Sequence, residues 1–307
     1  MQTAAWAAEG RTRVSSASIH DIIRRKVWEA RILAHITVSE DELRQHLPAE
    51  QVSALNYKTR PFFALVPRTS YFPLFLSQLR RHFDTIFTAM GQALPALTPW
   101  LDFQGHPLDW HYPIGHLYDE CHCWSADDAP SRPWTLTLHF THYPATLLPS
   151  LECQSEEGGG ALGMHFYSML KQADFIRHGS PKGMNNLSKN EQSQLWDGVW
   201  THSFDRFWRV GAKLVGSEDY QASWRSLPMR LYLKDSFRQS RRIIQAQVSP
   251  QSCTTLEDAL CHLEVSVESV SVYMHGVALP LDTLLSWLAL YFIFPDGFLH
   301  LIIVQEQ

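Results

Sequence analysis

The sequence MRLYLKD at residues 229–235, followed by RRIIQAQV at 241–248, decides the fold, because both segments carry the aliphatic and aromatic side chains typical of β-strands. Four further elements follow in order: a helix opened by Thr254 and Glu257, a strand VSVYMHG (270–276), a short helix capped by Asp282, and a strand FLHLIIV (298–304). Two strands, a helix, a strand, a short helix and a last strand form the order of a ubiquitin-like β-grasp, which buries one face of a small mixed sheet against its helix. The C-terminal part of the chain therefore predicts such a domain.

The N-terminal half repeats this pattern after a short amphipathic helix. Its predicted elements are the strands RILAHITV (31–38) and RPFFALV (60–66), a helix over 76–87, and the strands WLDFQG (100–105) and RPWTLTLHF (132–140). A long loop is expected between the last two strands. This order predicts a second ubiquitin-like β-grasp domain.

The middle of the chain has helical character instead. PSLECQSEEGGG (149–160) is a linker by composition, and a helix is expected over about 161–177. A second, single helix is expected from the capping box of Ser188 and Glu191 to Gly216, which would end it. The fold class is therefore α+β, with two β-grasp domains flanking a helix-rich domain. The expected boundaries are a flexible tail 1–17, a helix and first β-grasp 18–148, a helix-rich domain 149–224 and a second β-grasp 225–307.

The composition places the chain among globular proteins. Of its 307 residues 45% are hydrophobic and 19% are charged, and the net charge of −5 gives no general basic character that would favour nucleic acid. The mean hydropathy is −0.19, and no run of about eighteen apolar residues suggests a membrane span. Five scattered cysteines are too few for a disulfide framework, and the N-terminus lacks the pattern of a secretory signal. We expect a soluble, reduced, cytosolic protein without a cofactor.

Two motifs suggest chemistry. Gly158, Gly160 and Gly163 satisfy the dinucleotide-binding spacing G-x-G-x-x-G, but the acidic segment ECQSEE precedes them where a buried strand is needed, so a linker is the better interpretation. The segment GHLYDECHCW (115–124) gathers thiols and imidazoles that could bind zinc or form a nucleophilic pair. Its Cys121 and Cys123 are not in C-x-x-C spacing and would face opposite ways in an extended chain, so structural cysteines are the other interpretation.

The end of the sequence bears on conjugation. A ubiquitin-like modifier needs a flexible tail that ends in glycine, whereas LIIVQEQ (301–307) follows directly from a predicted strand. If conjugation is involved, we therefore expect this chain to be the acceptor, which must offer a lysine amine. There are seven lysines, and Lys171 lies inside the first middle helix.

Lys171 projects from the outer side of that helix. At about 100° per residue, one face gathers the apolar residues Leu162, Phe166, Leu170, Ala173 and Ile176, with Lys171 roughly opposite. The outer side is itself apolar: Met164, Tyr167 and Phe175 flank the lysine. This stripe is either a docking surface for a partner or the packing of a helix wedged between two domains.

Segments along most of the sequence, including the one that contains Lys171, resemble the autophagy protein 5 family. The resemblance rests on KVWEARI (26–32), FFALVPRTSYF (62–72), LDWHYPIGHLYD (108–119), WTLTLHFTHYP (134–144), MLKQADFIRHG (169–179), QLWDG with FDRFW (194–208), LPMRLY (227–232), and HGVALPLDTLLSWL with PDGFLHLIIV (275–304). It covers nearly the whole chain in order. The N-terminal tail, residues 39–58 and the Gly-rich linker depart from the family pattern.

The resemblance implies a conjugation scaffold. Members of the family have two ubiquitin-like domains around a helix-rich domain, receive the C-terminal glycine of autophagy protein 12 on one lysine, and bind a helix of autophagy protein 16 noncovalently. The acceptor lysine lies in the segment matched by MLKQAD, which assigns it to Lys171. With the E2-like autophagy proteins 10 and 3, the complex acts like a ubiquitin ligase that promotes transfer of autophagy protein 8 to phosphatidylethanolamine.

The resemblance also implies peripheral membrane contact, at the preautophagosomal structure and the isolation membrane. Arg225 in SWRSLP is the match to a family arginine implicated in that contact, with Arg230 nearby; ordinary solvated arginines are the alternative. Trp28 in KVWEARI is a candidate contact for the partner helix, or else packs its own helix on its own sheet. The expected protein is thus a noncatalytic acceptor. Its rivals are a hydrolase using Cys121 to Cys123 and a membrane adaptor that is never conjugated.

Overall fold

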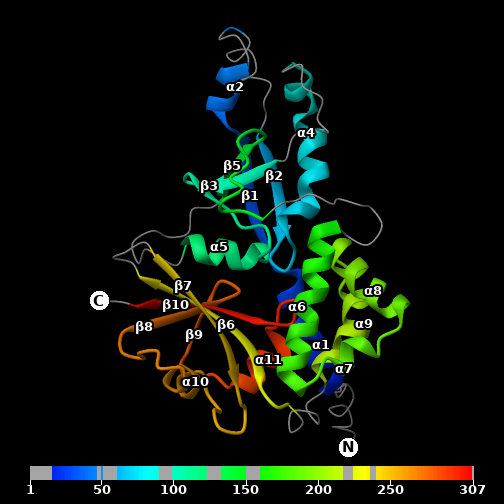
Figure 1. Cartoon of the computed structure of the whole chain (residues 1–307), viewed down its shortest axis with the longest axis vertical. Coiled ribbons are helices and arrows are strands. Elements are labelled where there is room, and N and C mark those ends of the chain that lie inside the picture. Colours follow the sequence, from blue (N-terminus) through cyan, green and yellow to red (C-terminus); the bar gives the residue numbers. More distant parts are fainter. Residues whose placement is uncertain are drawn as a thin grey trace, which may run out of the picture.

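The computed structural model describes residues 16–46, 50, 61–89, 99–122, 133–149, 160–216, 224–235 and 240–305. Three lobes surround a common junction (Figure 1): a first β-grasp domain at the top, a second at the lower left, and a helical domain at the lower right. The α+β class with two β-grasp domains around a helical domain is confirmed. Of the predicted tail 1–17, residues 1–15 lie outside the described residues.

The first β-grasp domain contains a five-stranded sheet in the order β2-β1-β5-β3-β4. Its strands are β1 (Arg31–Val38), β2 (Phe62–Pro67), β3 (Trp100–Phe103), β4 (His106–Pro107) and β5 (Trp134–His139). The first and last strands pair in parallel, with Ala34 opposite Trp134. Alternate residues of β1 are buried because one face of the sheet covers a core beneath α4 (Leu76–Ala89). The shorter α2 (Glu40–His46) and the 3-10 turn η1 (Phe72–Phe75) complete this part.

The second β-grasp domain repeats this topology, with the order β7-β6-β10-β8-β9. Its elements are β6 (Leu227–Asp235), β7 (Ser240–Val248), α10 (Leu256–His262), β8 (Val270–Met274), β9 (Val277–Leu279), α11 (Leu285–Tyr291) and β10 (Leu299–Gln305). Each sheet has one short strand that the sequence patterns did not predict, β4 and β9. Both follow a two-residue turn with positive φ, at Gln104–Gly105 and at His275–Gly276, as a tight hairpin requires.

The helical domain contains α6 (Gly160–His178), α7 (Lys182–Asn185), α8 (Lys189–Trp200) and α9 (Phe204–Val215). The capping box of Ser188 and Glu191 is present, and Gly216 ends α9 with a φ of 85°. The expected single helix over 188–215 is wrong, because the chain breaks at Thr201–Ser203. There His202 takes a φ of 50° and its Nε2 lies 3.0 Å from the carbonyl oxygen of Trp28. A contact with a distant segment therefore ends the helix.

Other predictions also need correction. The capping box of α10 is Thr255 with Asp258, one residue later than predicted. Asp282 does not cap α11, whose N-cap is Leu284; a backbone bond from Leu285 to Thr254 fixes that end instead. The first helix, α1 (Ser16–Glu29), begins two residues inside the predicted tail. The long loop before β5 contains α5 (Ile114–His122), so Cys121 lies on a helix and the extended-chain argument about it was wrong.

Buried polar groups stabilise the first β-grasp domain and join it to the second. Glu42 and Asp102 both contact the ring of His139, with Glu42 Oε1 3.1 Å from Nδ1. Burial alone would lower the pKa of His139, but the two carboxylates have the larger effect together, so its pKa is raised.

A second buried charge pair joins the first β-grasp domain to the second. Arg68 pairs with Asp119 on α5, and Asp119 Oδ2 accepts a hydrogen bond of 2.8 Å from the backbone N–H of Gly276 in the β8–β9 turn.

Candidate functional site

The helix α6 presents Lys171 to solvent on a firmly packed support. All five residues predicted for its inner face are buried: Leu162, Phe166, Leu170, Ala173 and Ile176. Phe166 packs at 5.5 Å between ring centroids against Trp196 of α8. Lys171 is exposed on the opposite side. The helix therefore holds the base of the Lys171 side chain at a defined place on the surface.

The neighbours of Lys171 differ from the predicted stripe in one respect. Met164 is 64% exposed and Phe175 is 52% exposed, so neither is packed between domains. Tyr167 is half-buried and turns toward α8, where its hydroxyl donates a bond of 2.9 Å to the carbonyl of Gln192. Burial raises the pKa of this phenol. The open apolar surface beside the lysine is thus formed by Met164 and Phe175, while Tyr167 ties two helices together.

The C-terminal end of α6 is anchored by buried charges. Asp174 accepts a bond of 2.9 Å from the backbone N–H of Met184 in α7. Arg177 is buried, and its Nη2 donates to the carbonyl of Gly297 in the second β-grasp domain at 3.1 Å. Burial lowers the pKa of Arg177 to about 10, and Asp174 opposes that shift. The group remains a cation at neutral pH and fixes α6 to its neighbour.

The two arginines considered for membrane contact lie in different settings. Arg225 is exposed beside the end of α6, where its backbone N–H donates to the carbonyl of Arg177 at 2.7 Å. Its guanidinium lies close to Gly179, since a Cβ added to that glycine would be 3.0 Å from Nη1 of Arg225. Arg230 lies over the ring of Phe298 at 4.6 Å and its Nη2 donates to Gln245. Arg225 is therefore the more available cation.

Trp28 takes part in packing rather than in an open surface. Its side chain is 3% exposed, and its ring lies 4.9 Å from Phe207 and 5.2 Å from His202 by centroid distance. Both neighbours belong to the helical domain, so Trp28 joins α1 to that domain instead of packing α1 on its own sheet. The expected contact with a partner helix finds no open face of Trp28.

The cysteine-rich segment does not assemble a recognisable site in the part of the chain that the structure describes. His116 is buried against the second β-grasp domain, Cys121 is half-buried, and His122 lies 2.8 Å from the carbonyl of Tyr118. Cys123 lies outside the described residues. Among the described side chains, no group of three or more His, Cys, Asp or Glu could hold a metal ion.

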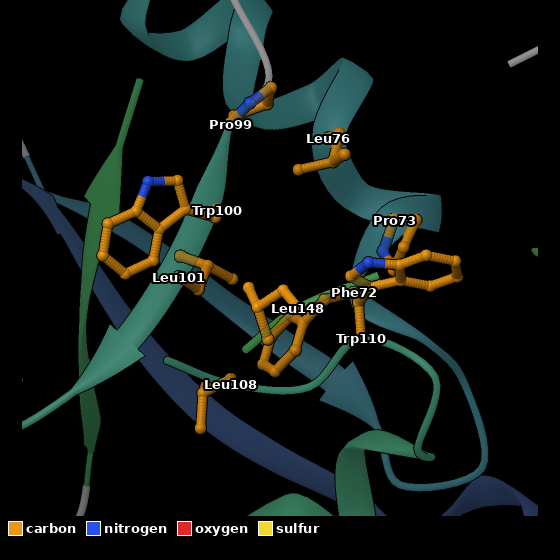
Figure 2. A pocket seen from close by; sticks show the side chains of 9 residues that line it. All are labelled: Phe72, Pro73, Leu76, Pro99, Trp100, Leu101, Leu108, Trp110 and Leu148. Atoms are coloured by element: carbon orange, nitrogen blue, oxygen red, sulfur yellow. The ribbon is translucent and has the colours of Figure 1, made fainter. Parts of the chain in front are cut away.

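An apolar pocket lies in the first β-grasp domain, and Lys171 is not part of its lining (Figure 2). It opens between η1, the start of α4, β3 and the segment that follows β4. Its lining is Phe72, Pro73, Leu76, Pro99, Trp100, Leu101, Leu108, Trp110 and Leu148. None of these side chains is a nucleophile or a general base, so the pocket can bind only by apolar contact. No helix among the described residues is long and apolar enough to cross a membrane.

Sequence patterns missed the junction between the domains. His111, His116, His165, His275 and His300 come from four separate segments and gather there. Their spacing in the sequence follows no motif, and only the count of sixteen histidines was unusual.

Three domain families match the chain in sequence order. They are "Autophagy protein ATG5, UblA domain" over residues 27–140, "Autophagy protein ATG5, alpha-helical bundle region" over 161–217, and "Autophagy protein ATG5, UblB domain" over 226–303. Together they cover most of the sequence and coincide with the three lobes. The chain belongs to the autophagy protein 5 family.

Relatives in distant organisms support membership in the autophagy protein 5 family. The chain is 31% identical to autophagy protein 5 of Drosophila melanogaster over 282 residues, which are 91% of this chain and 95% of that protein. It is 30% identical to autophagy protein 5 of Emericella nidulans, over 84% of this chain and 78% of the relative. The crystal structure of Kluyveromyces marxianus Atg5 has the same fold, with a TM-score of 0.71 at 22% identity, covering 92% of this chain and 99% of that one. A role in autophagy follows from the family.

Proposed function

We propose that Lys171 accepts an isopeptide bond from the C-terminal glycine of autophagy protein 12, and that this conjugate is the working form of the protein. The observation that carries the proposal is the exposed amine at the middle of α6, in the segment MLKQAD that resembles the family's acceptor segment. The protein itself supplies no nucleophilic catalyst in this scheme. It is an acceptor and a scaffold.

The transfer needs a neutral amine. The Lys171 amine attacks the glycine carbonyl of a thioester held by autophagy protein 10; the new C–N bond forms as the C–S bond breaks, the enzyme's thiolate leaves, and the amine gives up a proton. The amine must give up its proton to react, so the conjugating enzyme must orient and deprotonate it. A rigid helix supports this step because it keeps the backbone that carries the lysine in one position.

Replacing the lysine tests the assignment. Lys171→Arg keeps the positive charge and the helix, but its guanidinium stays protonated and cannot attack. Lys26→Arg is the matched control, because Lys26 is also exposed on a helix and lies near the exposed Ile19 and Ile22. In a reconstituted reaction with the activating and conjugating enzymes, we expect the conjugate band to vanish for Lys171→Arg and to persist for Lys26→Arg. An undiminished band for Lys171→Arg would show that another lysine is used.

Met164 and Phe175 are proposed as part of the surface on which the conjugated protein rests. Their exposure on the same helix as Lys171 supports this role, because both offer apolar surface to a partner that covers that helix. Phe175→Ala should leave the unfolding midpoint of the free protein nearly unchanged and should weaken packing of the conjugate, measured by protease resistance of the joined domain. Tyr167→Ala is a poorer probe, because it also removes the bond to Gln192. A marked loss of stability in Phe175→Ala would contradict the docking role.

Further roles of the family are proposed on the same basis. A helix of autophagy protein 16 binds noncovalently between the domains, and the complex promotes lipidation of autophagy protein 8 by autophagy protein 3 at the isolation membrane. Because Trp28 is buried, we propose that this helix contacts other residues of these surfaces. The rival hydrolase would require a metal or a reactive thiol near Cys121, and metal analysis of the purified protein distinguishes it.

Membrane contact is proposed to be local, weak and centred on Arg225. The net charge of −5 disfavours general attraction to anionic lipid, and one cation near such a surface contributes about 1 kcal/mol. Arg225→Glu should reduce flotation with anionic vesicles at low salt more than Arg209→Glu, which makes the same charge change at an exposed site on α9. Equal flotation of Arg225→Glu and the unaltered protein would remove Arg225 from the contact.

A further inference from the structure

The place where the three domains meet contains an unusual concentration of buried imidazole rings. His116 of α5 packs against Tyr232 and His300 of the second β-grasp domain, at ring-centroid distances of 4.0 Å and 5.3 Å. His300 bonds to the Tyr232 hydroxyl at 2.8 Å through Nδ1 and to Asp296 at 2.8 Å through Nε2. Imidazole in solvent is the side chain whose charge changes between pH 5 and 8.

His275 occupies a critical position in this junction. It lies in the β8–β9 turn, stacks on Phe294 at 4.0 Å, and its Nε2 lies 2.8 Å from the carbonyl of Phe292. Because a carbonyl only accepts, Nε2 carries the hydrogen, and the buried Nδ1 has no hydrogen-bond partner. A proton added at Nδ1 would therefore be a buried charge without an acceptor.

The groups facing His275 make that charge more costly. Arg68 of the first β-grasp domain lies against the same turn, since its guanidinium would be 3.1 Å from a Cβ at Gly276. Its counter-charge, Asp119 of α5, is already engaged by Arg68 and by the backbone N–H of Gly276. His300 faces His275 from β10 and adds no negative charge. Burial, with Arg68 next, lowers the pKa of His275 to about 3.

His165 of α6 repeats the arrangement on the other side of the junction. Its ring lies 4.4 Å from that of His111 in the first β-grasp domain. Asp109 and Asp296 face this pair with negative charge, and Arg230 faces it with positive charge. Burial is the largest influence and His111 the next, and together they lower the pKa of His165 to about 4.

We propose that this junction is an interdomain interface that opens in mild acid. Protonation of His275 and His165 breaks the contacts that hold the second β-grasp domain and α6 against the first β-grasp domain. Near neutral pH the two rings are neutral and pack as uncharged aromatic groups. In mild acid the opened form binds protons that the closed form excludes, so its population rises. Each β-grasp sheet stays folded, because these two rings lie at the edges of the domains and outside the strands of the sheets.

The size of the effect follows from proton linkage. A histidine released to solvent has a pKa of about 6.5, so between pH 7.5 and pH 5.5 each released ring favours the open form by about 10-fold, and the two together by about 100-fold. Hydrogen exchange of the full chain measures this opening, after correction for the intrinsic effect of pH on the exchange rate. The reporting amide is Gly276, which bonds to Asp119 across the two β-grasp domains; the reference is Leu301 in the central strand β10.

We expect protection at Gly276 to fall steeply at pH 5.5 while protection at Leu301 is retained. His275→Asn removes the titrating ring with a residue that tolerates a positive φ, and should reduce the pH response at Gly276 by about 10-fold. His165→Gln provides the same test on α6 should His275→Asn fold poorly. His262→Gln, at an exposed position of α10, is the matched control and should respond as the unaltered protein does. Unchanged protection at Gly276 between the two pH values, loss at Leu301 in step with it, or an unaltered response in both histidine variants would overturn the proposal.

Discussion

Replacement of Trp28 by alanine should be among the most destabilising single changes in the helical half of the protein. The indole is 3% exposed and fills the space between α1 and α9, in contact with Phe204, Phe207 and His202. Truncation of a buried Trp costs about 3–5 kcal/mol, because apolar contact is lost and a cavity remains. The bond from Nε1 to the His202 carbonyl is 3.4 Å long and adds little. We expect about 4 kcal/mol, a large part of a typical total stability of about 5–15 kcal/mol.

Urea unfolding followed by circular dichroism measures this loss. Trp200→Ala is the control, because Trp200 lies on the same domain but is 55% exposed, and we expect it to cost less than about 1 kcal/mol. Equal losses in the two variants would refute the packing argument. Trp28→Phe then separates packing from recognition, because phenylalanine retains most of the apolar contact. Tenfold weaker binding of the autophagy protein 16 helix at unchanged stability would show that Trp28 contacts the partner.

Three further predictions concern other buried contacts. Gly198→Ala should cost about 1–3 kcal/mol in urea unfolding, because the new Cβ would lie 2.7 Å from the backbone nitrogen of Phe207, which cannot move aside; a neutral result would show that α8 and α9 can separate. Asp119→Asn should cost about 3 kcal/mol by leaving Arg68 buried without its counter-charge, and a loss below about 1 kcal/mol would show that Arg68 finds another partner. The pKa of His139 is raised in the folded state, so the charged ring stabilises the fold fully below pH 6.5 and loses this effect as the pH rises through the native pKa. His139→Gln should therefore lower the free energy of unfolding most in acid. A loss of stability that grows toward high pH would contradict this assignment.

The periodic parts of the fold were predictable from the sequence. Alternation in RILAHITV and the aliphatic run LHLIIV are local properties, and both became strands of their sheets. The buried and exposed sides of α6 followed from helical spacing alone, which is why Lys171 could be placed on the surface without a structure.

The sequence-based predictions that failed concern features that depend on contacts between segments far apart in the sequence. The break at His202 needs the carbonyl of Trp28, which is 174 residues away. Tyr167 was assigned to the outer stripe because helical spacing does not reveal that α8 lies within reach of its hydroxyl. The junction histidines have no common spacing, so only folding brings them together. Of the candidate site, the sequence therefore predicted the amine and part of its apolar surroundings, and could not predict which neighbours other elements would cover.

The parallel pairing at the centre of each sheet has a consequence for synthesis on the ribosome. In the first domain β1 must wait for β5, since Ala34 pairs beside Trp134, one hundred residues later. In the second domain β10 lies between β6 and β8, so a strand made after all the others of that sheet forms its middle. A chain that stops before Leu299 lacks the strand to which both flanking strands bond. Such a fragment exposes unpaired strand edges, the kind of surface that chaperones and proteases recognise in nascent chains.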